Sequence, residues 1–241
     1  MSVTFASSPS CPSSPPVRRR DPAVGTGRCA LLAGASGLIG RALQALLQNS
    51  PAYALTHLLV RRAPAGDEAE ARTLVHIVDF ARLPELPPVD DCYIALGTTI
   101  KVAGSQAAFR AVDFDHVVDT ARAARTAGAT RLAVVSALGA DAHSRVFYNR
   151  VKGEMQVAIA GLGFESVVIA QPSLLLGDRA AIGQPVRSAE VWITRLLGPT
   201  MCLVPRGVRP IAATRVAAAL LTTTLAGAPG VRVLSSSQMQ G

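Results

Sequence analysis

Residues 31–40 read Leu-Leu-Ala-Gly-Ala-Ser-Gly-Leu-Ile-Gly, and this stretch decides the fold. It links a run of apolar residues, Cys29–Ala33, to a segment in which apolar residues recur at helical spacing from Ile39 to Leu47. The sequence Asn-Ser-Pro at residues 49–51 then ends the predicted helix. The stretch therefore predicts a buried strand that passes through a glycine turn into a helix.

Three glycines give this turn its chemistry. A glycine at the end of a strand allows a tight turn, a second lets a pyrophosphate approach bare backbone, and a third lets the helix pack closely on the sheet. The helix N-terminus offers N–H groups and partial positive charge to phosphates. A tight turn without a ligand needs the same glycines, but the flanking strand and helix favour dinucleotide binding. Cofactor contacts are predicted for Gly34, Ala35, Ser36, Gly37, Leu38, Ile39 and Gly40.

The composition fits one domain with one core. The chain has 241 residues, of which 49% are hydrophobic. Its four cysteines are scattered without a C-x-x-C pair, so we expect no metal site and a reducing compartment. The net charge of +8 comes from arginines spread along the chain without interleaved aromatics, so we expect no nucleic-acid partner. No uncharged apolar run reaches about 18 residues, which predicts no contact with a membrane.

Residues 1–27 form a segment rich in Ser, Pro and Arg, without hydrophobic periodicity. This composition is typical of a disordered tail. Arg18, Arg19 and Arg20 also fit a twin-arginine export signal, but cleavage behind them would remove the glycine turn. We therefore expect a cytoplasmic protein in which residues 28–241 form a single domain.

Short apolar segments alternate with helical segments along the chain. Strands are predicted at Leu55–Val60, Thr73–Val78, Cys92–Leu96, Leu132–Ser136 and Ser166–Ala170, and helices at Ser105–Ala127 and Arg145–Ala160. This order predicts an α/β fold, a doubly wound parallel sheet of the Rossmann type. Further on, helices are predicted at 186–197 and 212–225 and a strand at 231–234, with residues 177–230 forming most of a small cap on the substrate side.

Residues that follow the later strands complete the predicted cofactor site. The second strand ends in Arg61 and Arg62, where an acid would bind the ribose 2′-OH of NAD and an arginine accommodates the 2′-phosphate of NADP. We therefore predict NADP rather than NAD, although two solvated arginines would give the same pattern. Asp79 is interpreted either as a contact of the adenine amino group or as a surface carboxylate. The small residues around Leu96, Gly97 and Thr98 let the backbone pass under the cofactor.

The chemical signal is Tyr148 followed four residues later by Lys152. Residues four apart share a face of a helix, and an ammonium there lowers the pKa of the phenol from about 10 toward the range of an acid or base. The spacing also arises by chance, but Lys152 is one of only two lysines in this arginine-rich chain. Ser136, at the end of a predicted strand, either orients the substrate oxygen or merely ends the strand.

Together these segments resemble an atypical short-chain dehydrogenase/reductase, and more narrowly the Tat-interactive-protein oxidoreductase-like subgroup. The resemblance covers residues 28–225 and rests on GASGLIG at 34–40, LGTT at 96–99, AGS at 103–105, FRAVD at 109–113 and FYNRVKGE at 147–154. It implies an NADP-binding Rossmann fold with Tyr148 and Lys152 at the nicotinamide ribose and Pro172 and Ser173 near the carboxamide. Two positions depart from the pattern: Ala137 follows Ser136 where a second serine is usual, and Asp113 replaces an asparagine of many extended relatives.

Two main hypotheses for function follow. In the first, an NADP(H)-dependent oxidoreductase moves hydride to or from a small carbonyl or alcohol substrate. Tyr148 gives the proton, Lys152 lowers the pKa of Tyr148 and holds the ribose, and Ser136 orients the substrate oxygen. In the second, the chain is a non-catalytic NADP(H)-binding sensor or a module that binds a partner. A third and weaker alternative is an enzyme like a sugar-nucleotide epimerase or dehydratase. The Tyr148–Lys152 pair favours the first, because a sensor needs no acid.

Overall fold

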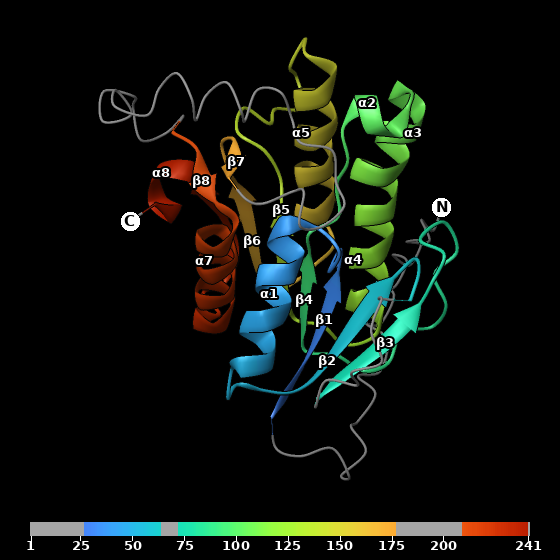
Figure 1. Ribbon diagram of the computed structural model, residues 1–241, viewed down its shortest axis with the longest axis vertical. Helices are drawn as coiled ribbons and strands as arrows, with labels where there is room; N and C mark the ends of the chain where they lie inside the picture. The colour runs from blue at the N-terminus through green and yellow to red at the C-terminus, as the bar shows by residue number, and fades with distance from the viewer. Residues whose placement is uncertain (1–26, 64–71, 177–208, 241) are drawn as a thin grey trace, which may run out of the picture.

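The computed structural model describes residues 27–63, 72–176 and 209–240. Seven parallel strands form one sheet in the order β3-β2-β1-β4-β5-β6-β9 (Figure 1). The strands are β1 (Arg28–Ala33), β2 (Tyr53–Val60), β3 (Thr73–Ile77), β4 (Asp91–Ile94), β5 (Arg131–Val135), β6 (Ser166–Gln171) and β9 (Gly230–Ser235). The strand order changes direction between β1 and β4. The prediction of a doubly wound α/β sheet is confirmed.

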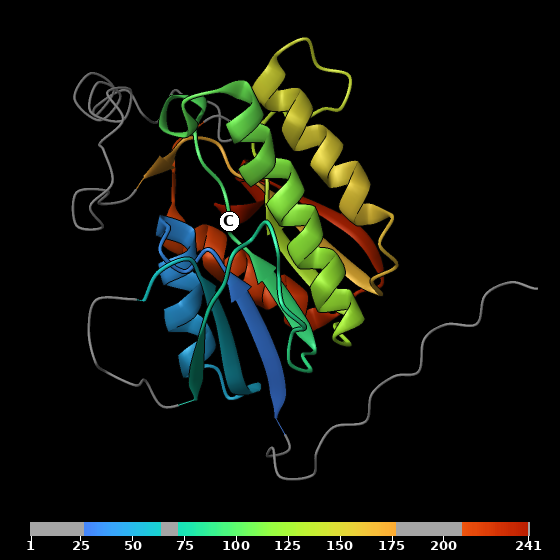
Figure 2. The same cartoon turned by 90° about the vertical axis from the view of Figure 1, so that its right-hand side faces the viewer.

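Helices cover both faces of the sheet (Figures 1 and 2). α1 (Leu38–Asn49) and α7 (Ala213–Ala226) lie side by side on one face, and α4 (His116–Thr126) and α5 (Phe147–Ala160) cover the other. The shorter elements are α2 (Ile100–Ala103), α3 (Gln106–Arg110), the π-helical turn η1 (Ala111–Asp115), α8 (Ser236–Met239) and the strand pair β7 (Leu175–Leu176) and β8 (Ile211–Ala212).

The two faces of the sheet give two apolar layers. Along β1, Leu31 packs toward α4 and α5 while Leu32 packs toward α1 and α7. Successive side chains of a strand point to opposite faces, so a strand covered on both sides must be apolar at nearly every position. This explains the continuous apolar run at 29–33, which is buried throughout.

A buried polar cluster lies near the amino ends of the central strands, at the end of the sheet opposite the glycine turn. The carboxylate of Asp91, fully buried, accepts hydrogen bonds from Arg28 Nε at 2.8 Å and from the Tyr53 hydroxyl at 2.6 Å. The Tyr53 hydroxyl also lies 2.7 Å from that of Tyr93. Burial, with further contributions from Asp91, raises the pKa of both phenols well above 10. The cluster therefore ties the starts of β1, β2 and β4 together.

The structure differs from the predicted elements mainly in the long helix before β5 and in the bounds of β2 and β4. The helix predicted at 105–127 consists of α3, η1 and α4, because a π-helical turn interrupts the α-helical spacing. β4 ends at Ile94, two residues before the predicted end, because the chain then leaves the sheet as a loop. β2 begins at Tyr53, because that residue already pairs with Arg28 of β1.

The C-terminal segments differ most from expectation. α7 packs beside α1 on the sheet, and β9 pairs with β6 as an edge strand, so both belong to the doubly wound fold and not to a cap. The helix predicted at 186–197 and the tail predicted at 1–27, except Gly27, lie outside the described residues, and the division into tail and domain stays a prediction. Among the helices of the described ranges, none is long and apolar enough to cross a membrane.

Candidate functional site

The glycine turn after β1 packs so tightly that no side chain fits at Gly34 or Gly40. Gly34 has φ +93°, a left-handed conformation that favours glycine, and a Cβ there would lie 2.6 Å from the backbone of Ala95. The N–H of Gly37 donates to the carbonyl of Gly34 at 3.1 Å. A Cβ on Gly40 would lie only 1.9 Å from that same carbonyl oxygen. The turn and the first turn of α1 are therefore in direct backbone contact.

The N-terminus of α1 opens at this turn without a side-chain cap. Gly37 is the N-cap residue and has no side chain to accept a bond, and the first turn of α1 carries no acidic residue. Ala35 and Ile39 are buried in the layer beneath, Leu38 packs against it, and Ser36 is exposed. The first N–H groups of a helix carry partial positive charge, so this end of α1 suits a phosphate.

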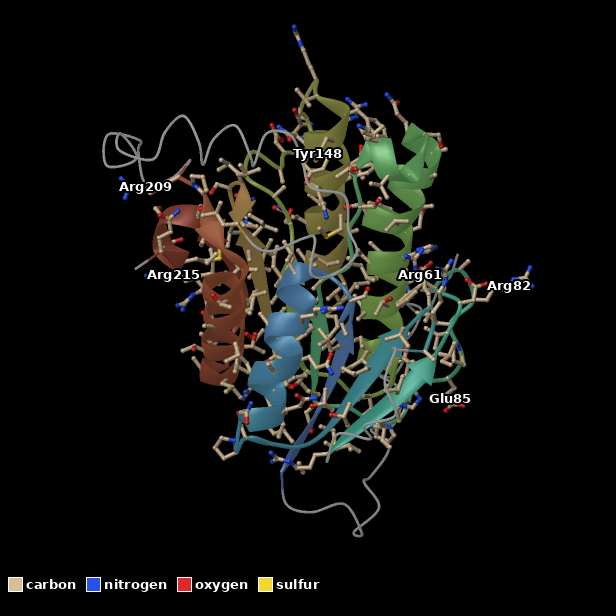
Figure 3. All side chains as sticks on the ribbon, in the orientation of Figure 1. Arg61, Arg82, Glu85, Tyr148, Arg209 and Arg215 are labelled. Atoms are coloured by element: carbon tan, nitrogen blue, oxygen red, sulfur yellow. The ribbon has the colours of Figure 1, made fainter. Side chains whose placement is uncertain are left out.

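The predicted adenosine-side residues lie at the ends of β2 and β3. Arg61 and Arg62 are exposed directly after β2, and Figure 3 shows the Arg61 side chain there. Asp79 is also exposed, and its Oδ1 accepts from the N–H of Ala81 at 3.0 Å. This side-chain bond to the backbone two residues on stabilises a local turn, and the contact of Asp79 with adenine stays a prediction.

The loop after β4 is held in place by a hydrogen bond to the side chain of Asp113. The N–H of Thr98 donates to Asp113 Oδ2 at 2.8 Å. A Cβ on Gly97 would lie 3.4 Å from Asp113 Oδ1 and 3.8 Å from Lys152 Nζ, so the loop runs directly over these two groups. Leu96, which precedes Gly97, packs against the α4–α5 layer.

Lys152 lies inside the fold and forms an ion pair with Asp113. The Nζ–Oδ1 distance is 2.8 Å, and the two side chains are 4% and 1% exposed. Sequence reasoning noted Asp113 only as a departure from a family pattern and missed this pairing. The sequence signal that was available is the replacement of a neutral amide by a carboxylate in a chain with only two lysines.

Tyr148 is half-buried in the first turn of α5 (Figure 3), one helical turn before Lys152. Its ring lies 5.3 Å from the ring of Phe109. Within the described parts of the chain its hydroxyl forms no hydrogen bond. α5 packs closely against the loop after β5 at Gly153, where a Cβ would lie 2.1 Å from the backbone of Ala142. Because Tyr148 and Lys152 are on the same helix, this close contact also sets their distance from that loop.

Ser136 is bonded to a different residue of α5, Gln156, one turn beyond Lys152. Its buried hydroxyl accepts from the Gln156 amide at 2.5 Å, and Gln156 in turn accepts from Gln171 at 3.2 Å. Gln156 follows Tyr148 by two turns of α5, or about 12 Å along the helix axis. The structure thus brings Tyr148 and Lys152 together on one helix but ties Ser136 to Gln156, and its role toward a substrate stays a prediction.

The segment after β6 contacts the C-terminal part of the chain. The carbonyl of Pro172 accepts from Leu138 N–H at 3.0 Å, and the Ser173 hydroxyl lies 2.9 Å from that of Ser236 and donates to the carbonyl of Arg209. These bonds place Pro172 and Ser173 beside the C-terminal segments. Their predicted contact with a carboxamide stays a prediction.

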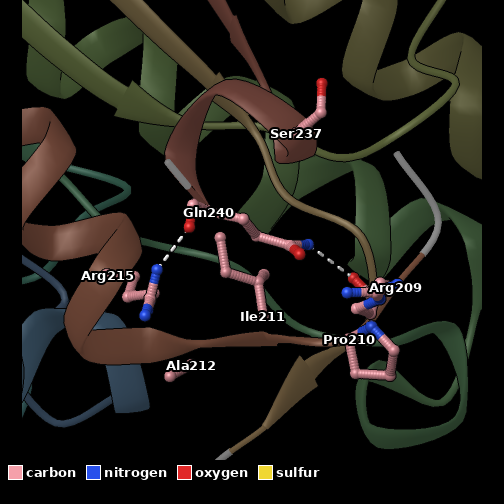
Figure 4. Close-up of a pocket in the computed structure, with 7 residues that line it drawn as sticks. All are labelled: Arg209, Pro210, Ile211, Ala212, Arg215, Ser237 and Gln240. Atoms are coloured by element: carbon pink, nitrogen blue, oxygen red, sulfur yellow. Dashed lines mark hydrogen bonds between the residues drawn. The ribbon is translucent and has the colours of Figure 1, made fainter. Parts of the chain in front are cut away.

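Beside this segment the surface has a pocket of about 340 Å³ (Figure 4). It is lined by Arg209, Pro210, Ile211, Ala212, Arg215, Ser237 and Gln240. The Gln240 side-chain amide donates to the Arg209 carbonyl at 2.9 Å, and Arg215 donates to the Gln240 carbonyl. Among the described residues, two guanidinium groups and no acid line the pocket, so the charge of this part of the lining suits an anionic group. Elsewhere in the described ranges, no cluster of His, Cys, Asp and Glu is arranged to hold a metal.

Comparison with solved structures shows the fold. MoeE5, in complex with UDP-glucose and NAD, matches 85% of this chain and 74% of its own with a TM-score of 0.63 and 18% identity. A UDP-N-acetylglucosamine 4-epimerase from Methanobrevibacter ruminantium M1 matches 87% of this chain and 76% of its own with a TM-score of 0.63 and 10% identity. No family model matches the sequence.

A curated relative shows the family. Protein fmp52, mitochondrial, from Emericella nidulans is 35% identical over 175 residues, which cover 69% of this chain and 75% of the relative. Three further relatives also have "mitochondrial" in their names, so the expectation of a cytoplasmic protein is wrong. That expectation treated residues 1–27 as a tail without a targeting role. At this identity and coverage, the chain belongs to the FMP52 family.

Proposed function

We propose that this chain is an NADP(H)-dependent oxidoreductase that transfers hydride to or from a small carbonyl or alcohol substrate. The observation that carries the proposal is the glycine turn at residues 34–40, called the cradle below, in which backbone packing leaves no room for a Cβ at Gly34 or Gly40, next to the uncapped N-terminus of α1. In open parallel sheets, ligands bind at the carboxyl edge where the strand order reverses, and the cradle lies there, between β1 and β4. The resemblance to atypical short-chain dehydrogenases/reductases supports the proposal, and the NAD named with MoeE5 supports a nicotinamide cofactor without favouring NADP over NAD.

The choice of NADP over NAD rests on the end of β2. Arg61 and Arg62 are exposed there, and residues 61–63, which the structure describes directly after β2, include no acid that would accept from a ribose 2′-OH. A guanidinium pairs well with a 2′-phosphate because both groups are charged and their geometries match.

Tyr148 and Lys152 would carry the chemistry of this chain. The bound cofactor supplies or takes the hydride. The Tyr148 hydroxyl then gives a proton to the substrate oxygen as negative charge develops on it, which is general acid catalysis. The Lys152 ammonium, one turn further along α5, holds the ribose and stabilises the tyrosinate that remains. Ser136 stays the candidate for orienting the substrate oxygen.

The test is a screen of carbonyl compounds for oxidation of NADPH by the purified chain. We expect Tyr148→Phe to lower turnover by about 10²- to 10⁴-fold with NADPH affinity unchanged, because the phenol acts only in the transition state. Lys152→Ala should reduce both turnover and NADPH affinity. If Tyr148→Phe keeps full turnover, the catalytic assignment fails. If NADPH binds but no compound is reduced, the alternative of a non-catalytic binding module gains support.

A second candidate function is that of a sugar-nucleotide epimerase or dehydratase. The pocket with Arg209 and Arg215 favours it, because two guanidinium groups without an acid suit a diphosphate, and the two solved neighbours are named with UDP compounds. The test is to incubate the cofactor-loaded chain with UDP-glucose and UDP-N-acetylglucosamine and to follow the sugar signals by NMR. New sugar signals that disappear in Arg215→Gln would support this candidate over the reductase.

We also propose that the chain is targeted to mitochondria. The names of the relatives support this, and residues 1–27 are rich in Ser and Arg with Asp21 as the only acid, a composition shared with transit peptides. The full chain with a C-terminal fluorescent protein should colocalise with a mitochondrial dye in fungal cells. A version without residues 1–27 should lose that location; if both versions stain the cytosol, this proposal fails.

A further inference from the structure

The Asp113–Lys152 pair has an unusual environment for two charges. Both side chains are almost fully buried, at 1% and 4% exposure, between η1, α5 and the loop after β4. Removing either charge from water costs several kcal/mol, so each requires the other. Asp113 Oδ2 also accepts from the Thr98 N–H at 2.8 Å, so the carboxylate itself has two partners.

The π-helical turn η1 explains how Asp113 reaches this place. A π-helical turn holds one extra residue, which rotates the side chains around the helix axis by about 100° relative to an uninterrupted α-helix. Asp113 sits inside η1 and is buried, whereas Asp115 two residues later is exposed. Such turns often occur at functional sites. The turn therefore directs one carboxylate, Asp113, inward onto Lys152.

We propose that Asp113 is a positioning residue that keeps Lys152 in its charged form inside the fold and directs its ammonium toward the loop after β4. A buried ammonium without a counter-charge gives up its proton instead of remaining charged. A neutral Lys152 could neither stabilise a tyrosinate at Tyr148 nor pair with an anion. The inference rests on the proposed function only for the use that catalysis makes of this charge.

The neighbouring charges do not substitute for Asp113. Arg110 and Arg150 both pair with Glu154, and these three side chains are 31–41% exposed, so solvent screens them. The other charged side chains on the elements packed around Lys152 are all exposed: Lys101 on α2, Asp115 on η1, Asp119, Arg122 and Arg125 on α4, and Asp141 on the loop after β5. Asp113 is thus the buried counter-charge of Lys152 among the described residues.

The experiment uses the fact that the chain holds only two lysines, Lys101 and Lys152. Protein labelled with ¹³C at lysine Cε gives two side-chain signals, which Lys101→Arg assigns. Their shifts are followed against pH in the folded protein without cofactor or substrate. In Asp113→Asn we expect the Lys152 signal to change to that of the neutral amine at a lower pH than in the native chain, because the buried ammonium has then lost its counter-charge. The Lys101 midpoint should stay unchanged, and so should both midpoints in the matched control Asp119→Asn, whose side chain is exposed.

An equal Lys152 midpoint in Asp113→Asn and in the native chain would overturn the proposal. If Asp113→Asn does not fold, the native chain alone still tests it, because a neutral-amine signal for Lys152 at pH 7 would also overturn it. Absence of turnover in the carbonyl screen, together with the expected midpoints, would count against the proposed function and not against the role of Asp113.

Discussion

Replacing Gly40 with alanine should damage the candidate cofactor site through a direct clash with the backbone of the glycine turn. The new Cβ would lie 1.9 Å from the Gly34 oxygen, 2.7 Å from the Gly34 carbonyl carbon and 2.9 Å from the Ala35 Cα, all of them backbone atoms. Ordinary contact requires the turn and α1 to separate by about 1.5 Å. Overpacking of this kind costs about 1–3 kcal/mol of stability, or roughly 2–12 °C in melting temperature for a chain of this size.

The same displacement should weaken cofactor binding. Phosphate contacts with backbone N–H groups depend on the position of the turn, and losing one charge-assisted bond costs about 1.5–3 kcal/mol, which is at least tenfold in affinity. The assays are a thermal melt and a fluorescence titration with NADPH. Gly161→Ala is the matched control, because a Cβ there lies 3.6 Å from the nearest atom, the Ala158 carbonyl oxygen. If Gly40→Ala binds NADPH as tightly as Gly161→Ala, the assignment of the cradle is refuted.

Two further predictions concern stability. Burial and the neighbouring His76, whose Nε2 lies 2.9 Å from His57 Nδ1, lower the pKa of His57 from 6.5 to about 4. Between these pH values the unfolded chain binds a proton at His57 that the folded chain does not bind. The free energy of unfolding should therefore fall by about 1–2 kcal/mol as the pH drops from 6.5 to 4. Denaturant titrations at the two pH values should show a smaller fall for His57→Gln. Asp91→Ala should lower the free energy of unfolding by about 3–5 kcal/mol in the same assay, because it leaves Arg28 without its buried partner. The control Asp119→Ala, at an exposed ion pair, should lower it by less than about 1 kcal/mol. Equal losses in the two variants would contradict the stabilising role of the buried Asp91 carboxylate.

The sequence predicted the parts of the fold that depend on local physics. The run at 29–33 is buried on both faces, so its apolar character appears directly in the sequence, and Gly34 and Gly40 stand where the backbone leaves no room for a Cβ. The alternation of strands and helices then suffices for a parallel sheet, because parallel neighbours need a crossover between them.

The parts that failed depend on contacts between distant residues. β9 was expected near a cap because nothing within residues 230–235 indicates that its partner is β6. The role of Ser136 toward a substrate stays a prediction, but the bond of its hydroxyl to Gln156 was not foreseen, because only the packing of α5 on the sheet brings the two residues together. The Asp113–Lys152 pair was missed for the same reason, because the π-helical turn that directs Asp113 inward has no distinct pattern in the sequence.

The most direct test of the account is calorimetry of NADPH and NADH binding to the purified chain and to the double variant Arg61→Ala/Arg62→Ala. The account predicts that NADPH binds the native chain more tightly than NADH. The double variant should lose about 1.5–3 kcal/mol of NADPH binding free energy and keep its affinity for NADH, because only the 2′-phosphate contact is removed. Equal affinities of the native chain for the two cofactors, or no loss in the variant, would contradict the assignment of NADP, and absence of binding by either cofactor would contradict the whole account.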